Sequence, residues 1–264
     1  MKLKLKNLCN DIVFLWQFSL DDFKSKYAGS AAGAAWAILQ PLSTIILYWF
    51  VFQIGFKSQP VTSVPFVLWL VAGLLPWLFF SEAIANATSA LADYSYLVKK
   101  IKFNLYILPL VKIVSGLFVH AVLVGFVICM FAGYGILPDL YYLQLPFYAL
   151  FMIIVLAGIC FFTATMFVFF KDVIQVVSIL LQVIFWTTPI VWSIDIMDTT
   201  VQNVITHTPF YYFVNGYRDI FVNKVWFWSY GISNVLYYWG VALLILAVGL
   251  ITFVKCKNHF ADVL

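Results

Sequence analysis

Glu82 and Lys112 are charged side chains that stand well inside long apolar runs. Glu82 lies about eight residues from one end of its apolar run, and Lys112 lies about seven residues inside the next run. If both runs are helices that cross a membrane, at 1.5 Å per residue both side chains lie about 10–12 Å from the same end of their helices. An unpaired charge in such surroundings costs several kcal/mol or is neutralised. The sequence therefore predicts an intramembrane pair of Glu82 and Lys112. His120 would lie roughly 12 Å deeper than Lys112 and is a poor partner for Glu82.

Motifs that would carry catalysis are absent from the sequence. It contains no G-x-x-x-x-G-K-[ST] loop for ATP, no H-E-x-x-H zinc motif and no G-x-S-x-G nucleophile turn. The cysteines share no metal-ligand spacing, and we interpret them as small apolar residues; they are Cys9, Cys129, Cys160 and Cys256. We therefore expect no catalytic residue, no metal site and no cofactor held by this chain.

Six apolar runs must position these residues, and they take up over half of the 264 residues. Hydrophobic residues make up 64% of the chain and charged residues only 10%. A bilayer core of roughly 30 Å needs about 20 apolar residues per helix. The sequence predicts an all-α membrane protein with one six-span domain over 31–264. The predicted spans are 31–56, 64–90, 105–132, 144–170, 173–194 and 229–254.

Basic residues are distributed unevenly between the loops that six spans would create. If both termini share one side, 12 of the 15 Lys and Arg fall on that side, and the other side has Lys57, Arg218 and Lys224. By the positive-inside rule, both termini are then cytoplasmic. The net charge of +4 orients the chain and meets anionic membrane lipids. It does not predict a nucleic-acid partner.

Residues 1–30 predict a helix that lies along a membrane surface. Apolar residues recur there at spacings of three and four, with charges on the opposite side, which is typical of an amphipathic interface helix. Asp11, Asp21 and Asp22 interrupt the apolar core that a signal peptide would need. A helix packed on a soluble partner is the alternative interpretation.

Two connecting segments are neither spans nor ordinary loops. Segment 195–228 is rich in aromatic residues yet carries charges, and Thr208 before a proline is a good helix start. We expect two short helices there, about 198–206 and 209–221, which dip into the outer interface as a lid. Segment 91–104 mixes aromatic and basic residues. It suits a short helix that docks on another protein or, alternatively, a basic loop held by lipid head groups.

Four stretches of motif-like sequence cover most of the chain in order. They are DFKSKYAGS (22–30) with WAILQPL (36–42); GLLPWLFFSE (73–82) with LVKK (97–100) and LPL (108–110); FFKDV (169–173) with FWTTPIVW (185–192); and TPFYY (208–212) with GYRD (216–219). Together they resemble the permease subunit of type-2 ABC exporters, in the family that moves lipid-linked polysaccharide such as O-antigen, capsule or teichoic acid. Asn104 and Thr208 depart from the residues usual in that family.

The resemblance implies a two-fold homodimer above two copies of a separate ABC ATPase, which would bind the ATP and Mg²⁺. The helix over 1–27 would be the interface helix. Segment 91–104 would be the coupling segment seated in a cleft of the ATPase, through Tyr94, Tyr96, Lys99, Lys100 and Phe103. The helices of 195–228 would form the outer gate, which includes Phe210, Tyr211, Tyr212, Tyr217 and Arg218.

The same resemblance implies export of an undecaprenyl-diphosphate-linked, O-antigen-like polysaccharide across the bacterial cytoplasmic (inner) membrane, as lipopolysaccharide biosynthesis requires. Aromatic residues make up 20% of the chain and suit stacking on sugar rings. A pore along the dimer axis would be lined by Trp36, Trp77, Trp186 and Trp192. The lipid diphosphate would meet Lys24 and Lys26.

Other interpretations of these residues stay open. The tryptophans could be membrane anchors and the lysines topology signals. The chain could export a small lipid or a drug, or it could be a membrane-embedded enzyme or a scaffold.

Overall fold

The described part of the chain is built from helices throughout. The computed structural model describes residues 2–57, 64–99 and 103–264, and no strand occurs among them. Five helical segments there are long and apolar enough to cross a bilayer, and a further apolar helix is shorter. The predicted all-α membrane fold is therefore confirmed. The five segments are Gly33–Gly55, Phe66–Thr88, Ile107–Gly133, Leu140–Phe169 and Ile232–Val263, and the shorter helix is Val173–Thr187.

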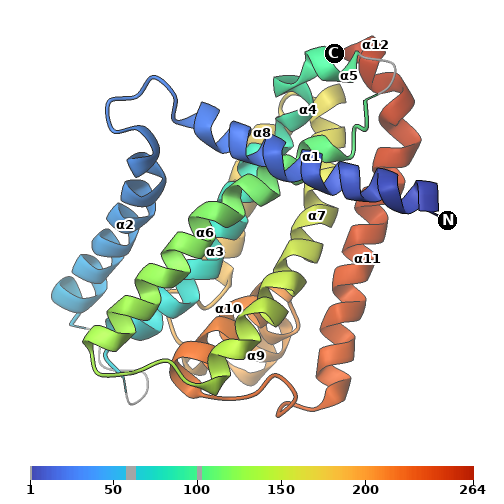
Figure 1. The fold of residues 1–264 in the computed structure, drawn as a ribbon. Helices are drawn as coiled ribbons and strands as arrows, with labels where there is room; N and C mark the ends of the chain where they lie inside the picture. The colour runs from blue at the N-terminus through green and yellow to red at the C-terminus, as the bar shows by residue number, and fades with distance from the viewer. Residues whose placement is uncertain (1, 58–63, 100–102) are drawn as a thin grey trace.

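The helices follow one another along the chain as Figure 1 shows. The α-helices are α1 Lys2–Lys26, α2 Trp36–Trp49, α3 Phe66–Thr88, α4 Ala90–Asp93, α5 Ser95–Val98, α6 Ile107–Gly133, α7 Leu145–Phe169, α8 Val173–Thr187, α9 Thr199–Thr206, α10 Pro209–Arg218, α11 Ile232–Cys256 and α12 Phe260–Val263. The 3₁₀ segments are Gly33–Ala35, Leu140–Gln144, Ile194–Ile196 and Lys257–His259, and the π-helical segments are Phe50–Gly55 and Asp219–Asn223.

Helix α3 is the centre of the bundle because most of its surface is apolar, with Ser81, Glu82 and Asn86 as its partly exposed polar residues. Its side chains are buried along almost its whole length, and it packs against α6, α7, α8 and α10. A helix that is apolar all round is stable only when other elements surround it. By contrast, α2 buries only Ala37, Pro41 and Ile45 among its residues, so one side of α2 faces away from the rest of the chain.

Helices α7 and α11 approach each other closely through two glycines. A Cβ added to Gly249 would lie 2.0 Å from the carbonyl oxygen of Gly158, and a Cβ added to Gly158 would lie 2.6 Å from the backbone of Ile245. Small residues allow such backbone contact between helices in lipid, where van der Waals packing drives association. These two glycines therefore fix α11 against α7.

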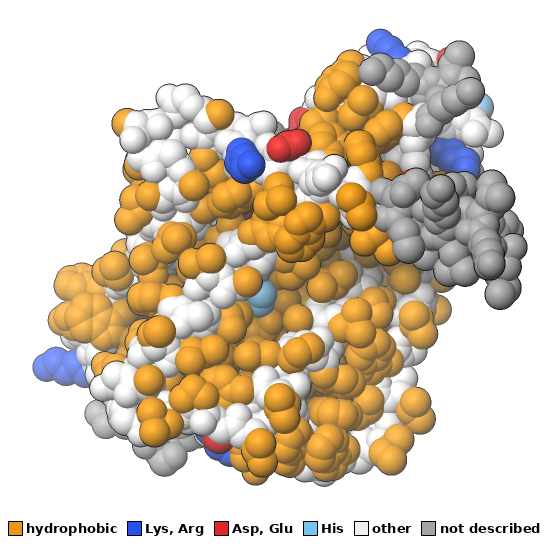
Figure 2. Space-filling view, viewed as in Figure 1, with side chains coloured by type: hydrophobic (Ala, Val, Ile, Leu, Met, Phe, Trp, Pro, Cys, Tyr) orange, Lys and Arg blue, Asp and Glu red, His pale blue; other side chains and the backbone are white. Residues whose placement is uncertain are grey.

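The two ends of the bundle differ in what covers them. Helix α1 lies across one end, together with the C-terminus, and α9 and α10 lie at the other (Figure 1). We call them the α1 end and the α10 end. The face in Figure 2 is broadly hydrophobic, with its visible charged side chains near the two ends. A chain that crosses a bilayer needs this distribution, because charge is costly in the hydrocarbon core.

Helix α8 is shorter than the predicted span 173–194. It ends at Thr187, and Thr188 has an extended backbone with φ −82° and ψ 132°. Pro189 is the physical cause, because the proline ring excludes the preceding residue from the helical region. A helix of 15 residues reaches only about 22 Å. The prediction of six full-length spans is thus corrected to five and one short apolar helix among the described residues.

Candidate functional site

A groove runs lengthwise between α2, α3 and α8. It consists of two adjoining cavities of about 580 and 410 Å³, which share Thr44, Leu78, Ser81 and Leu181 in their walls. The larger cavity reaches Lys26 at the α1 end, and the smaller one reaches Trp186 near the end of α8. We call it the α2–α8 groove.

The walls of the α2–α8 groove carry polar side chains that the sequence places on one face of each helix. On α2 these are Gln40 and Thr44, and on α8 they are Ser178 and Gln182; a spacing of four residues keeps each pair on the same side of its helix. Pro41 lies between the first pair and has no N–H to offer the Ala37 carbonyl. The groove therefore has hydrogen-bonding capacity inside an otherwise apolar bundle.

Aromatic rings form the end of the groove nearest Trp186. The Phe185 ring stacks on Tyr48 of α2 at 5.7 Å between centroids and contacts Trp77 of α3 at 5.8 Å. Trp186 packs edge-on against Phe185 at 5.2 Å, and its side chain is 53% exposed. This end of the groove thus offers flat ring surfaces next to hydrogen-bonding groups.

The structure places only two of the four predicted channel tryptophans in this groove. Trp77 and Trp186 border it. Trp36 is half exposed at the start of α2, and Trp192 follows the end of α8, where its Nε1 donates to the Trp186 carbonyl at 3.1 Å. Neither Trp36 nor Trp192 is among the residues that line the groove.

At the α1 end, the groove is bordered by an ion pair between Lys26 of α1 and Glu82 of α3. Both side chains are partly exposed, at 37% and 34%. Burial alone would lower the pKa of Lys26, but the hydrogen bond and the charge of Glu82 outweigh it and raise the pKa. Lys24 is exposed on the same helix. The two predicted phosphate-binding lysines thus differ, because Lys26 is already paired with a carboxylate.

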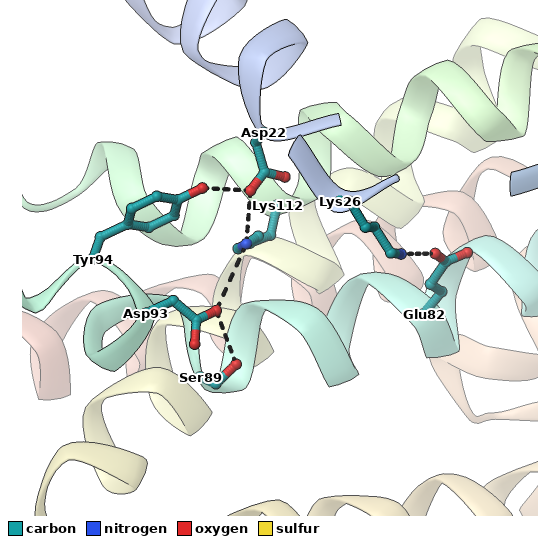
Figure 3. A network of polar contacts seen from close by, with 7 residues as sticks. All are labelled: Asp22, Lys26, Glu82, Ser89, Asp93, Tyr94 and Lys112. Carbon is teal, nitrogen blue, oxygen red and sulfur yellow. Dashed lines mark hydrogen bonds and ion pairs between the residues drawn. The ribbon is translucent and has the colours of Figure 1, made fainter. Parts of the chain in front are cut away.

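Lys112 belongs to a separate network at the same end (Figure 3). Its Nζ lies 2.7 Å from Asp22 Oδ1 and 3.7 Å from Asp93 Oδ2. The Tyr94 hydroxyl donates to the same Asp22 oxygen, and the Ser89 hydroxyl donates to Asp93 at 3.2 Å. Because Asp22 is on α1, Lys112 on α6 and Asp93 on α4, the network fastens three elements together.

The predicted pair of Glu82 and Lys112 is therefore wrong. Each of the two residues is neutralised by a residue of α1 instead. Lys26 forms an ion pair with Glu82, and Asp22 forms one with Lys112. Depth along the two spans does not include α1, which lies across this end of the bundle (Figure 1) and supplies both partners. Asp22 and Lys26 are one helical turn apart, so one face of α1 supplies both counter-ions.

The predicted coupling segment forms two short helices, α4 and α5. Tyr96 is 59% exposed, and Lys99 is exposed. Phe103 is half buried against Phe14 of α1 at 6.1 Å between ring centroids. The Tyr94 hydroxyl, in contrast, bonds to Asp22 within the chain. Lys100 lies outside the described residues.

At the opposite end, helices α9 and α10 occur where the sequence predicts two short helices. The predicted helix start at Thr208 is confirmed, since its hydroxyl accepts a hydrogen bond from Tyr211 N at 3.2 Å. Tyr212 and Tyr217, proposed as gate residues, are buried, while Phe210 and Tyr211 are half buried. The second helix ends sooner than predicted, at Arg218, and a π-helical turn continues to Asn223.

Arg218, the remaining predicted gate residue, is buried and bonds to other segments inside the bundle. Its guanidinium donates to the carbonyls of Pro189 at 2.6 Å and Ile190 at 2.7 Å, and it lies 3.5 Å from the centroid of the Trp69 ring. A Cβ at Gly73 would lie 2.7 Å from the guanidinium, so a larger residue at this site on α3 would force the Arg218 side chain to shift. Arg218 thereby joins α10 to α3 and to the segment after α8.

Sequence reasoning missed two polar contacts of the bundle. His120 Nε2 lies 2.7 Å from the Tyr217 hydroxyl, a partner about 100 residues away that no local pattern indicates. The second contact is the ion pair of Asp22 with Lys112 at 2.7 Å, which joins α1 to α6 and has no local signal in the sequence either.

Comparison with known proteins agrees with this architecture. The family model described as "ABC-2 type transporter" matches residues 15–222. The O-antigen export system permease protein RfbA of Klebsiella pneumoniae is 29% identical over the full length of both chains. A second protein of that name from the same organism is 28% identical over 92% of each chain, and the one from Myxococcus xanthus is 26% identical over 76%. By the extent of the family match, the chain belongs to the ABC-2 type transporters.

Proposed function

We propose that this chain is the channel-forming permease subunit of an ATP-driven exporter of an O-antigen-like, lipid-linked polysaccharide. The names of its relatives support this substrate class. The α2–α8 groove supports the transport role, since it combines hydrogen-bonding side chains with exposed rings. ATP hydrolysis belongs to a separate ABC ATPase in this proposal, and the chain is a permease and not an enzyme.

The observation that carries the proposal is that the groove is one-sided. Helix α2 buries few of its residues, and α8 exposes Ile179, Leu180, Val183 and Trp186. A second copy related by a two-fold axis would present the same groove and close both into one shared channel. We therefore propose a homodimer with the channel at its axis.

A sugar polymer suits the chemistry of this channel. Aromatic faces stack on successive sugar rings, and they bury apolar area without fixing one register. Gln40, Thr44 and Gln182 supply hydrogen-bond partners for hydroxyls along the way. At the α1 end, Lys24 is the exposed cation for a lipid diphosphate, whereas Lys26 would have to exchange Glu82 for the phosphate.

The α1 end faces the cytoplasm in this proposal, so both termini are cytoplasmic and the membrane is the bacterial inner membrane. The excess of basic residues on that side supports this orientation. The ATPase would then dock below α4 and α5, where Tyr96 and Lys99 are exposed. Tyr94 would act from inside by holding α4 to Asp22.

The test replaces one groove tryptophan and one tryptophan outside it. Trp186→Ala removes an exposed ring of the groove. Trp49→Ala is the matched control, because Trp49 is 37% exposed on α2 and does not line the groove. Losing one stacking contact is expected to slow export about two- to tenfold. Polysaccharide on the cell surface is measured in cells that make the polymer and its lipid carrier.

Membrane insertion and the amount of protein are checked for both variants. Normal polysaccharide export by Trp186→Ala, or an equal loss of export in both variants, would show that the polymer does not pass through the groove. If the variants leave surface polysaccharide unchanged but alter export of a small lipid or drug, that small molecule is the substrate and the polysaccharide is not.

A further inference from the structure

Residues 257–264 turn back onto the bundle at the α1 end. Helix α11 ends at Cys256, and the chain continues as the 3₁₀ turn Lys257–His259 and then as the short helix α12. Helix α12 packs against α5 and α7, and it lies beside α5 in Figure 1. We call residues 257–264 the α12 hook.

Phe260 holds the α12 hook in the bundle. Its side chain is fully buried, with 0% exposure. Its ring centroid lies 5.3 Å from that of Phe253 on α11 and 6.2 Å from that of Phe169 at the end of α7. Buried aromatic rings are among the largest contributors to packing energy. The hook is therefore fixed to α7 and α11 by a core contact of its own.

A second contact joins the hook to the chain that leaves the predicted coupling segment, 91–104. Lys257 Nζ donates to the Tyr106 hydroxyl at 3.3 Å and lies 5.2 Å from the centroid of the same ring. Tyr106 directly precedes α6, and its ring packs on Phe253 at 5.0 Å between centroids. The hook thus contacts both α5, within the segment, and the residue through which the segment returns to the bundle.

Helix α5 needs such support because it is short. It consists of four residues, Ser95–Val98, of which Val98 is buried. A helix of one turn is not stable by itself, so contacts with its surroundings must fix it. Among the described elements, those that pack most extensively on α5 are α4, its neighbour along the chain, and α12. Without the hook, α5 would be attached mainly through α4.

We propose that the α12 hook positions α5 for contact with the ATPase. Tyr96 and Lys99, which are exposed, are then held at a fixed place. A displacement of α5 reaches α7 and α11 through Phe260, in addition to the path through α4. The contact of α5 with an ATPase rests on the proposed function, whereas the support of α5 by the hook does not. Phe260 is a positioning residue, because it acts through α5.

The test measures hydrogen exchange in the purified full-length permease in lipid nanodiscs, without an ATPase. The amides of 97–99 report on α5, because they donate to carbonyls of the preceding turn. Phe260→Ala should make them exchange about tenfold faster, because the contacts that hold a segment govern its local opening. Phe260→Leu keeps a large apolar side chain and should restore most of the protection. Lys257→Met removes only the contact with Tyr106 and should speed exchange about twofold.

Phe131→Ala is the matched control. Phe131 is also 0% exposed, but it lies toward the α10 end of α6, where its ring packs on Phe221 at 5.3 Å between centroids. Its loss should lower Tm as Phe260→Ala does and leave the exchange of 97–99 unchanged. Equal exchange in wild type and Phe260→Ala, or equally faster exchange in both alanine variants, would overturn the support of α5 by the hook.

Export separates positioning from a merely structural role. Surface polysaccharide is measured in cells that make the polymer, its lipid carrier and the ATPase, at matched amounts of inserted permease. Phe260→Ala should reduce export about two- to tenfold, the cost of ordering one or two loosened side chains when the ATPase docks, and Phe260→Leu should restore it. Faster exchange with normal export would overturn the positioning role. A wild-type chain that exports no polysaccharide refutes the proposed function instead and leaves the exchange result standing.

Discussion

Removing Lys112 should destabilise the chain far more than removing Glu82, although both are charges at the ends of spans. Lys112→Met leaves Asp22 buried at 8% exposure without a cation, and only the neutral hydroxyls of Tyr94 and Ser115 remain beside it. Glu82→Gln leaves Lys26 at 37% exposure, where water can solvate it. The comparison therefore separates a buried pair from a partly solvated one on the same face of α1.

The magnitude follows from the geometry. At 2.7 Å and an effective dielectric constant of about 20, the attraction between Lys112 and Asp22 is about 6 kcal/mol before desolvation is subtracted. Breaking a buried pair costs about 3–5 kcal/mol of unfolding free energy. Because Asp22 keeps its hydrogen bond from Tyr94, Lys112→Met should lose about 3 kcal/mol, at the lower end of this range. Asp22→Asn should cost about 2 kcal/mol, because Lys112 keeps Asp93 at 3.7 Å. The double variant should lose about 2 kcal/mol, which gives a coupling of about 3 kcal/mol.

Thermal unfolding of the purified protein in detergent measures these differences. At about 2–4 °C per kcal/mol for a chain of this size, Lys112→Met should lower Tm by about 6–12 °C. Glu82→Gln should cost no more than about 1 kcal/mol. Equal losses of Tm in Lys112→Met and Glu82→Gln, or a loss in the double variant equal to the sum of the single variants, would contradict a strong coupling between Lys112 and Asp22.

Two further predictions concern Asp22 and the α7–α11 contact. Burial alone would raise the pKa of Asp22, but the hydrogen bonds from Lys112 and Tyr94 outweigh it and hold the pKa below the ordinary value of 3.8. A carboxyl group whose pKa is lower in the folded than in the unfolded state stabilises the folded protein at pH values above its unfolded pKa. The Tm difference between wild type and Asp22→Asn should therefore be constant from about pH 5 to 8 and shrink below about pH 4. A Tm difference that grows on acidification would contradict this prediction. Gly249→Ala should destabilise by more than about 2 kcal/mol, because its Cβ meets the Gly158 carbonyl at 2.0 Å. Gly240→Ala, with open space around it, is the control in the same helix. Equal Tm values for the two variants would show that α11 shifts away from α7 at no cost to make room for the added methyl group.

The helices and their caps could be predicted from the sequence because their signals are local. Long apolar runs locate the spans, and Thr208 before proline begins α10 as expected. The end of α8 was equally readable in principle, since Pro189 excludes Thr188 from the helix. The prediction followed hydropathy through that proline instead, and so made the span too long.

The partners of charged residues could not be predicted in the same way. The partner of Glu82 depends on where α1 crosses the bundle, and that placement results from packing such as Trp16 against Phe118 at 5.0 Å. The burial of Arg218 likewise depends on backbone carbonyls some 30 residues away. Sequence spacing gives depth along one helix, but contacts between helices require the tertiary arrangement.

If the α2–α8 groove is the channel, as proposed above, the shortness of α8 sets the length of one wall of the path that a polymer crosses. Hydrocarbon is about 30 Å thick, yet this helix spans only about 22 Å before the chain turns extended at Thr188. The wall that α8 contributes to the groove is therefore shorter than the full-length spans beside it. In the proposed dimer, such a short wall would shorten the stretch over which sugar hydroxyls lie away from water, and so lower the desolvation cost of every repeating unit that passes.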